Sequence, residues 1–373
     1  MKIVVNARLL RKNQMDGLGW FSYFTLQHIV KQNPSVEFHF LFDSGIKEEF
    51  VFADNVVPHN LFPPAKHALL NIAWFEWSVR NTLNKINPDL FFSPDGLLCL
   101  GWKGKQYGMI ADLNFFHNPE DLKWSNQKYY NYFFPRGAKI AARLATISAY
   151  SKNDIVKTFN VDPDKIDIVY CGVNNLLNPV DAAQQAAVRL KWTGGKDYFI
   201  FVGTLHPRKN ILRLLEAFES FKIQTHADIK LVIAGKPSYK SNEMYDQHNR
   251  MSSKDDVIFT GRIQDGEINN VLGSALALVF VPHFEGFGIP ILEAMQCDVP
   301  VICSNTTSMP EVAGEAAIMV DPFNVEEIKE AMIRIYSDPA LRNDLVSKGR
   351  QRKKVFSWER TSDLLWNSME KCL

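Results

Sequence analysis

Short apolar runs alternate along the chain with segments of helical periodicity. Residues 198–202 (YFIFV) and 277–281 (ALVFV) are apolar throughout, which is typical of strands buried on both faces. Between them a helix is predicted whose apolar positions, at offsets 0, 3, 4, 7 and 10, are Ile211, Leu214, Leu215, Phe218 and Phe221. Fully buried strands separated by helices predict parallel sheets that are covered by helices on both faces.

The same pattern extends over both halves of the chain. In the first half we expect strands at residues 3–5, 36–42, 90–92, 107–110 and 144–147, and helices at 19–32, 65–86, 129–142 and from Ser151. In the second half we expect strands at 198–202, 230–234, 257–260, 277–281 and 299–303, with helices after residues 210, 265 and 290. The fold class is therefore α/β, with doubly wound, Rossmann-like sheets whose ligands bind at the carboxyl ends of the strands.

The length of 373 residues suits two domains of roughly 150 to 200 residues each. The Asn and Pro residues of CGVNNLLNP, at 171–179, interrupt regular structure and mark the boundary. The terminal segment FSWERTSDLLWNSMEKCL reads as a helix that packs back on the first domain through Trp358, Leu365 and Trp366. We predict one domain of residues 1–172 plus 356–373 and another of 173–355, facing each other across a cleft.

Composition narrows the class of protein. The net charge is +1, so binding to nucleic acid through bulk charge is not expected. The five Cys residues are widely spaced and form no CxxC, which argues against a disulfide framework or a zinc site and favours a reducing compartment. The start, MKIVVNARLL, is typical of a first strand rather than a signal peptide. No run of about 18 apolar residues predicts a membrane span, so we expect a cytoplasmic protein.

The segment VFVPHFEGFGIPILEAMQCDVPVI carries the strongest chemical signal. A strand is followed by a glycine turn and by a helix that begins near Pro290, with Glu285 in the turn and Glu293 in the first helical turns. The backbone N–H groups of Gly286, Phe287 and Gly288 precede the helix, where an anion or a hydroxyl-rich ligand is favoured. A carboxylate such as Glu293 can accept from both hydroxyls of a ribose diol. The alternative is that Glu293 only complements the helix dipole.

The segment YFIFVGTLHPRKNILRLLEAF places two cations before a helix. Arg208 and Lys209 follow the strand, and Asn210 is expected to cap the helix. Two cations beside a helix N-terminus suit a phosphate group, although a solvated basic loop is the alternative.

Two further segments give weaker signals. In ICSNTTSMPEV, Ser308 and Glu311 fit a capping box, and the hydroxyls of Thr306 and Thr307 are within reach of a phosphate. In NARLLRKNQMDGLGWFSY, Gly17 and Gly19 follow the first strand and precede a helix, a pattern that a plain turn also explains.

Taken together, these segments resemble glycosyltransferase family 4. EGFGIPILE is similar to the E-x7-E motif of that family, and VGTLHPRKN and NTTSMPEVAGEAA are similar to its flanking motifs. The resemblance extends over nearly the whole chain, through DGLGW, LFFSPDG, ADLNFFHNPEDL, ATISAYSKNDI and VYCGVN. It is closest to the branch that acts in bacterial polysaccharide biosynthesis.

The resemblance implies a GT-B fold and a retaining transfer of a sugar from a nucleotide diphosphate-sugar, with no metal and no cofactor. The first domain would face the acceptor, a saccharide or a lipid-linked acceptor, and the second would bind the donor. Carried over by position, Glu293 would bind the donor ribose, and Lys209 with Arg208 would neutralise the diphosphate. Glu285 and the backbone at 286–288 would face the transferred sugar and its phosphate, while Gly17 and Gly19 would close on the diphosphate from the first domain.

Two positions depart from the family pattern. Many relatives have His-Asp after the fifth strand, where this chain has Ala111-Asp112, so Asp112 is expected to support the reacting centre. The alternative is that Asp112 is a turn-former after a strand. The arginine that often follows the strand glycine is Thr204 here, and Arg208 is expected to supply that charge.

Other functions stay open at this point. The protein could be another GT-B enzyme, such as a nucleotide-sugar epimerase, which needs no acceptor, or a phosphorylase. It could also be a binding protein that keeps the donor site without catalysis. The aromatic segment ALLNIAWFEWSVRNTL leaves peripheral membrane contact open, but Trp74, Phe75 and Trp77 form no clean stripe, so their burial in the first domain is expected. The sequence names neither the sugar nor the base, the acceptor or the oligomeric state.

Overall fold

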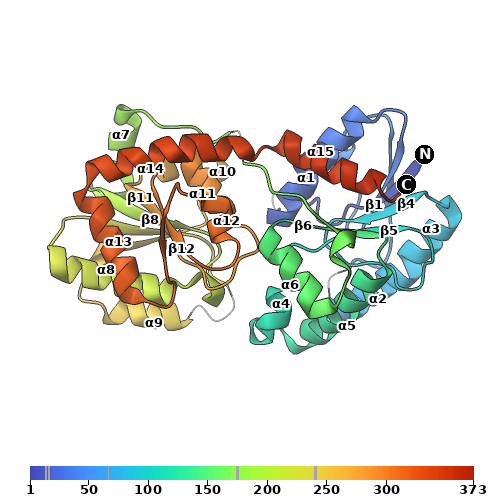
Figure 1. Cartoon of the computed structure of the whole chain (residues 1–373), viewed down its shortest axis with the longest axis horizontal. Helices are drawn as coiled ribbons and strands as arrows, with labels where there is room; N and C mark the ends of the chain where they lie inside the picture. The colour runs from blue at the N-terminus through green and yellow to red at the C-terminus, as the bar shows by residue number, and fades with distance from the viewer. Residues whose placement is uncertain (13–14, 16, 66, 174–175, 239–241) are drawn as a thin grey trace. The chain divides into compact units, whose positions relative to one another are not determined.

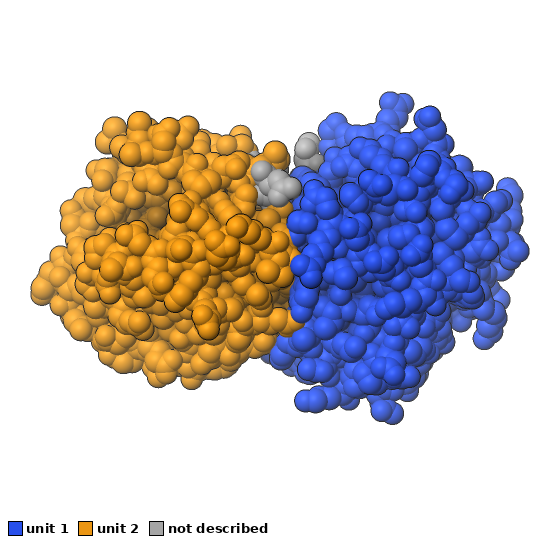
Figure 2. All heavy atoms as spheres, turned by 45° about the horizontal axis from the view of Figure 1, so that its top comes forward, with its two compact units in different colours: residues 1–172, 357–373 blue, residues 173–356 orange. Residues whose placement is uncertain are grey.

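The computed structural model describes residues 1–12, 15, 17–65, 67–173, 176–238 and 242–373. The chain divides into two compact units, coloured separately in Figure 2. Unit 1 comprises Met1–Gly172 and Ser357–Leu373, and unit 2 comprises Val173–Phe356.

Unit 1 is built on a seven-stranded parallel sheet with the order β3-β2-β1-β4-β5-β6-β7. Its strands are β1 (Lys2–Asn6), β2 (Glu37–Phe42), β3 (Val56–Asn60), β4 (Leu90–Ser93), β5 (Gln106–Met109), β6 (Arg143–Thr146) and β7 (Ile166–Ile168). Its helices are α1 (Gly17–Gln32), α2 (Ala68–Ala73), the π-helix η2 (Trp74–Val79), α3 (Arg80–Ile86), α4 (Asn114–His117), α5 (Trp124–Ile140), α6 (Ala149–Phe159) and α15 (Trp358–Glu370).

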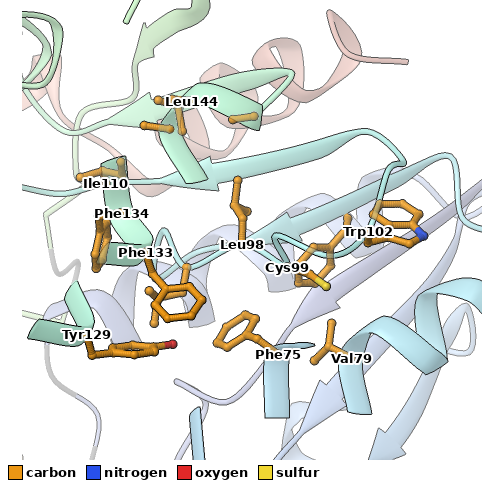
Figure 3. Packing of buried hydrophobic residues seen from close by; sticks show 14 of the residues in the cluster. Phe75, Val79, Leu98, Cys99, Trp102, Ile110, Tyr129, Phe133, Phe134 and Leu144 are labelled. Carbon is orange, nitrogen blue, oxygen red and sulfur yellow. The ribbon is translucent and has the colours of Figure 1, made fainter. Parts of the chain in front are cut away.

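The C-terminal helix returns to unit 1. Figure 1 shows α15 beside α1 on one side of the sheet, with α2, α4 and α5 on the other. The Trp358 ring stacks on Phe24 of α1 at 5.0 Å between centroids, so this helix packs on α1 within unit 1. On the opposite face, aromatic side chains of η2 and α5 pack against Leu98 and Cys99 beneath the sheet (Figure 3).

Unit 2 is built on a six-stranded parallel sheet with the order β10-β9-β8-β11-β12-β13. Its strands are β8 (Tyr198–Val202), β9 (Lys230–Ala234), β10 (Val257–Gly261), β11 (Ala277–Phe280), β12 (Val301–Ser304) and β13 (Ile318–Val320). Its helices are α7 (Ala182–Thr193), α8 (Ile211–Thr225), α9 (Asn242–Arg250), α10 (Asp265–Gly273), α11 (Ile289–Gln296), α12 (Met309–Ala313), α13 (Val325–Ser337) and α14 (Pro339–Arg352). Within this unit, Figure 1 shows α10 and α14 on one side of the sheet and α8 and α9 on the other.

The predicted strands all form, and both sheets are parallel and doubly wound, which confirms the fold class. Three strands were not predicted, namely β3, β7 and β13. Each lies at an edge of its sheet, and β3 contains Pro58, so their sequences lack the continuous apolar run of a central strand. The helix expected at 65–86 is interrupted by the π-helical segment η2.

The aromatic segment of unit 1 is only partly buried. Trp74 and Phe75 lie in the core, as expected, whereas the Trp77 side chain is 67% exposed, so the expected burial is wrong for Trp77. The three side chains differ because they leave the same helical segment in different directions. Among the described helices, none combines the length and the hydropathy that a bilayer span requires.

Candidate functional site

The turn between β11 and α11 carries the acidic and glycine residues singled out by the sequence. Gly288 has a φ of +101°, which favours glycine, and a Cβ at this position would lie 2.6 Å from the Met309 Cε atom. Pro290 stands in the first turn of α11, where its missing N–H costs no hydrogen bond. The sequence therefore folds here into a narrow turn that leads directly into a helix N-terminus.

Glu285 is brought to the two cations of the β8–α8 connection. Arg208 and Lys209 belong to the short 3-10 helix η5 (Pro207–Lys209), and the Lys209 Nζ atom donates a hydrogen bond to Glu285 Oε2. The Arg208 Nη2 atom lies 3.9 Å from Glu285 Oε1. The side chains of Lys209 and Glu285 are only 11% and 15% exposed, so this pair is screened weakly by solvent.

The charge state of Glu285 follows from these contacts. Burial acts to raise the pKa of its carboxyl group, but the nearby charges of Lys209 and Arg208 outweigh it. The pKa of Glu285 therefore lies below its ordinary value, and the group is a carboxylate at neutral pH.

Glu293 has the opposite environment. It lies on α11, its side chain is half-buried, and none of the described residues forms an ion pair or a hydrogen bond with its carboxyl group. Burial alone raises the pKa of Glu293 to about 7. A ligand that donates hydrogen bonds to the ionised carboxylate would stabilise that form, so the burial of Glu293 favours binding of such a ligand.

Two expected helix caps are wrong. Asn210 precedes α8 with a left-handed backbone, and its side-chain amide donates to the backbone oxygens of Val281 (2.9 Å) and Pro322 (2.6 Å) instead of capping the helix. Ser308 precedes α12 but makes no capping hydrogen bond, because its hydroxyl is directed to the β11–α11 turn. In both cases a buried carbonyl elsewhere competes successfully for the side-chain donor.

A cavity of about 130 Å³ lies beside η5 in unit 2. Its apolar wall includes Ile211 and Met244, and its polar wall includes Asn210, Arg213 and His283. These polar groups contact one another, since Arg213 Nη1 lies 3.2 Å from both Asn210 Oδ1 and His283 Nε2. They hold the base of the loop that carries Arg208 and Lys209.

The glycine pair of unit 1 lies in a helix rather than in a loop. Gly17 and Gly19 both belong to the first turn of α1, whereas the sequence pattern placed them before the helix. A Cβ on Gly19 would lie 3.0 Å from Met15 Cβ and 3.1 Å from the Leu9 carbonyl oxygen, so a larger residue here would require the preceding chain to shift by a few tenths of an ångström. The first turn of a helix is also where backbone N–H groups lack intrahelical acceptors.

Asp112 follows β5 and shapes the chain there. Its Oδ1 atom accepts a hydrogen bond of 2.9 Å from the backbone N–H of Asn114, the geometry of a turn-forming aspartate. The neighbouring polar residues are also engaged: Asn114 Oδ1 accepts from Asn118, and His117 Nε2 lies 2.8 Å from Asp154. The structure thus favours the turn-forming role that the sequence also allowed, and a catalytic role for Asp112 stays a prediction.

Several buried polar groups beside these positions were not identified from the sequence. Ser304 Oγ donates to the Pro282 carbonyl at 2.6 Å, below the turn that carries Glu285. In unit 1, Arg8 Nε lies 2.5 Å from Asp95 Oδ2, and both side chains are nearly buried at the carboxyl ends of β1 and β4. Neither pair has a local sequence signal, because its partners are distant along the chain.

Comparison with known proteins identifies two matching family models. The model of glycosyltransferase family 4 matches residues 15–175, and that of glycosyl transferases group 1 matches residues 184–352. The O-antigen chain mannosyltransferase B of Escherichia coli is 30% identical over 252 residues, which cover 66% of this chain and 65% of that relative. The chain thus aligns with slightly less than two thirds of that relative.

Solved structures share the fold over the whole chain. Sucrose-phosphate synthase from Thermosynechococcus elongatus aligns with a TM-score of 0.79 at 17% identity, covering 100% of this chain and 98% of the other. The Anabaena protein HepE, solved in complex with UDP and glucose, aligns with a TM-score of 0.76 at 14% identity and covers 100% of both chains. These similarities confirm the GT-B fold expected from the sequence.

Proposed function

Because this chain belongs to the family 4 and group 1 glycosyltransferases, we propose that it transfers a sugar from a nucleotide diphosphate donor to a saccharide acceptor in polysaccharide biosynthesis. We further propose mannose as the sugar, since the E. coli relative is a mannosyltransferase. The proposal is carried by two acidic groups of unit 2 that lie on one turn and its helix. Glu285 is paired with Lys209, whereas the Glu293 carboxyl group has no partner among the described residues.

Lys209 and Arg208 are proposed to bind the donor diphosphate. The ammonium group of Lys209 has three donors, so it can keep its hydrogen bond to Glu285 while donating to a phosphate oxygen. The leaving diphosphate gains negative charge as its bond to the sugar breaks, and a cation already held in place lowers that barrier. The second cation, Arg208, lies 3.9 Å from the other carboxylate oxygen of Glu285, Oε1, and is proposed to add to the effect.

Glu293 is proposed to bind the donor ribose. Its carboxylate can accept hydrogen bonds from both hydroxyls of the diol, and no described residue competes for it. Because burial raises the pKa of Glu293 to about 7, this contact also makes donor affinity dependent on pH near neutrality.

The proposed chemistry retains the configuration of the sugar and uses no metal. The bond from the anomeric carbon to the phosphate oxygen breaks, the acceptor oxygen attacks the same face, and the acceptor proton passes to the leaving phosphate oxygen. A carboxylate near the sugar stabilises the oxocarbenium-like transition state, a role proposed for Glu285 and, from unit 1, for Asp112. Gly17 and Gly19 are proposed to contact the diphosphate.

Unit 1 is proposed to bind the acceptor, which is either a saccharide or a lipid-linked saccharide. The exposed indole of Trp77 is consistent with peripheral contact at the inner face of a membrane, where Trp side chains are favoured. We propose a cytoplasmic location with peripheral contact at the inner face of the membrane.

A thermal-shift panel tests the donor site. GDP-mannose, UDP-glucose and ADP-glucose are added separately, and a true donor present at 100 times its Kd stabilises the protein by about 2.7 kcal/mol. If none of the three nucleotide sugars raises the melting temperature, the proposed donor site is rejected.

A product assay then tests the reaction. Radiolabelled sugar from the stabilising donor is expected to appear in a mannose-containing oligosaccharide acceptor. Binding without transfer over a broad acceptor panel would indicate a binding protein, and conversion of the donor without any acceptor would indicate an epimerase.

A further inference from the structure

The outward face of α5 carries aromatic and basic side chains in alternation. Trp124, Lys128, Tyr132 and Arg136 follow one another at intervals of four residues, which places them on one side of the helix. All four are exposed, Trp124 by 72% and Tyr132 by 50%. We call these four residues the α5 stripe. The opposite side of the helix packs into the core of unit 1 through residues such as Phe133 (Figure 3).

Each cation of the α5 stripe lies over the aromatic ring one turn before it. The Lys128 Nζ atom is 6.0 Å from the centroid of the Trp124 ring, and the Arg136 guanidinium carbon is 3.7 Å from that of the Tyr132 ring. Arg136 also donates a hydrogen bond of 3.0 Å to the Tyr132 backbone oxygen. The stripe therefore presents positive charge directly beside an exposed indole and an exposed phenol.

The charge of α5 is of one sign. Between Trp124 and Ile140 the helix contains Lys128, Arg136 and Lys139 but no Asp or Glu. A helix face that is only solvated usually carries both signs, because opposite charges three or four residues apart stabilise it. Cations without such acidic neighbours on the helix, next to exposed aromatic rings, favour a partner that is anionic and also accepts apolar side chains.

The adjoining segment of α2 and η2 supplies apolar side chains. α2 contacts α5 within unit 1, and Figure 1 shows both helices on the same side of the sheet. Leu69 is 74% exposed, Ile72 37% and Trp77 67%. Phe62 is 80% exposed and lies beside this segment, because the Ser78 hydroxyl donates to the Phe62 backbone oxygen. Exposed apolar side chains that gather in this way mark a surface for a partner or a membrane.

The charge decides which partner fits this surface. A second copy of the chain that met it through the same face would bring the α5 cations of both copies together, which is unfavourable. An anionic bilayer instead offers headgroups to the cations and an apolar boundary to the exposed Leu, Ile and Phe side chains. Trp and Tyr side chains are favoured at that boundary.

We propose that the α5 stripe and the exposed residues of α2 and η2 form a docking surface for bilayers of anionic phospholipid. The inference rests on the proposed peripheral contact, which it deepens by naming the surface and the class of lipid, and it is independent of the donor site. The cations select anionic lipid, and the apolar side chains enter the headgroup boundary. Docking would concentrate the protein where a lipid-linked acceptor is found.

The test measures flotation of the full-length protein with vesicles of phosphatidylcholine alone and of an equal mixture with phosphatidylglycerol. The wild type is compared with the double variant Lys128→Ala/Arg136→Ala. The matched control is Lys31→Ala/Lys47→Ala, which removes two exposed cations of unit 1 outside α5 and gives the same net charge. Trp124→Ser tests the aromatic part of the stripe. Melting temperatures are recorded with and without the nucleotide sugars.

We expect the wild type to float with the mixed vesicles and not with the neutral ones, and its binding to weaken as salt is added. A cation near an anionic surface contributes about fivefold to partitioning, so Lys128→Ala/Arg136→Ala should bind about 20-fold less and the control nearly as the wild type. Trp124→Ser should bind less at low and at high salt alike. All variants should keep the wild-type melting temperature and its response to the donor.

Three results would overturn the inference. The wild type might float with neither kind of vesicle, or Lys128→Ala/Arg136→Ala might bind the mixed vesicles as tightly as the control does. Tighter binding of polyuridylate than of mixed vesicles would assign the cations to nucleic acid. Each of these outcomes leaves the donor site intact if sugar is still transferred to an acceptor in solution. Conversely, a protein that floats but responds to no nucleotide sugar would keep the docking surface and lose the proposed donor site.

Discussion

Lys209 and Glu285, 76 positions apart in the sequence, are hydrogen-bonded partners in unit 2. The pairing keeps Glu285 ionised despite its burial and holds the Lys209 ammonium at the end of η5. Lys209 is proposed to act on the phosphate end of the breaking bond and Glu285 on the sugar end. Each of these two side chains thus holds the other in position.

Lys209→Ala should lower the transfer rate about tenfold or more, because the leaving-group charge loses its main cation. The acidic limb of the pH–rate profile should also move to higher pH, since Lys209 no longer lowers the pKa of Glu285. Steady-state kinetics from pH 4 to 8 measures both effects. The control is Lys191→Ala, which removes an exposed ion pair to Glu267 in the same unit and should leave the profile unchanged.

Arg208→Ala should also cost about tenfold in rate, since Arg208 supplies the charge that Thr204 does not. Its effect on the pH profile should be smaller than that of Lys209→Ala, because Arg208 lies 3.9 Å from the Glu285 carboxylate. An unchanged rate in this variant would show that Arg208 does not act on the diphosphate.

Glu293→Gln should weaken donor binding by about 1 to 3 kcal/mol at pH 8, because a charge-assisted contact with the ribose is lost. Donor affinity of the wild type should rise as pH increases through about 7, where the Glu293 carboxyl group ionises, and affinity of the variant should be nearly flat. Calorimetric titrations at several pH values check this. Equal affinities of the two proteins at pH 8 would rule out the ribose role.

The same raised pKa has a consequence for stability. The carboxyl group of Glu293 stays protonated in the folded state up to about pH 7, whereas it ionises near its ordinary value when the chain unfolds. Its stabilising contribution is therefore complete below the unfolded pKa and is lost as pH rises through about 7. Without ligand, Glu293→Gln should show less decrease in melting temperature than the wild type between pH 5 and 8.

Asp112→Asn should lower kcat about tenfold or more while donor affinity stays nearly unchanged, the sign of a contact made mainly in the transition state. The asparagine oxygen can still accept from the Asn114 N–H, so the turn and the melting temperature should be preserved. Wild-type kcat in this variant would leave Asp112 with its turn-forming role alone.

Activity should persist in excess EDTA, because the proposed leaving-group stabilisation comes from Lys209, Arg208 and backbone amides. Among the residues that the structure describes, no group of three or more His, Cys, Asp or Glu side chains is arranged to hold a metal ion. Loss of activity on chelation, restored by Mg²⁺ or Mn²⁺, would contradict the metal-free mechanism.

The amino-acid sequence by itself determined the parallel α/β class and the local chemistry of the β11–α11 turn. Continuous apolar runs such as 277–281 indicate strands that are buried on both faces. Glu285 and Gly288 lie in one turn and Glu293 lies in the helix that follows it, so their short spacing in the sequence keeps them in adjacent elements. These features depend on neighbours close along the chain, so their periodicity and composition suffice.

Only the tertiary structure decided which partners the polar side chains take. Ser308 and Asn210 both have the residue types of helix caps, yet each donates to a carbonyl of the loop after β11. Trp77 is exposed beside buried Trp74 although both belong to one aromatic segment. The physical reason is that a hydroxyl or an amide binds whichever buried acceptor is nearest in space, and that acceptor is fixed by how strands and helices pack, not by sequence spacing.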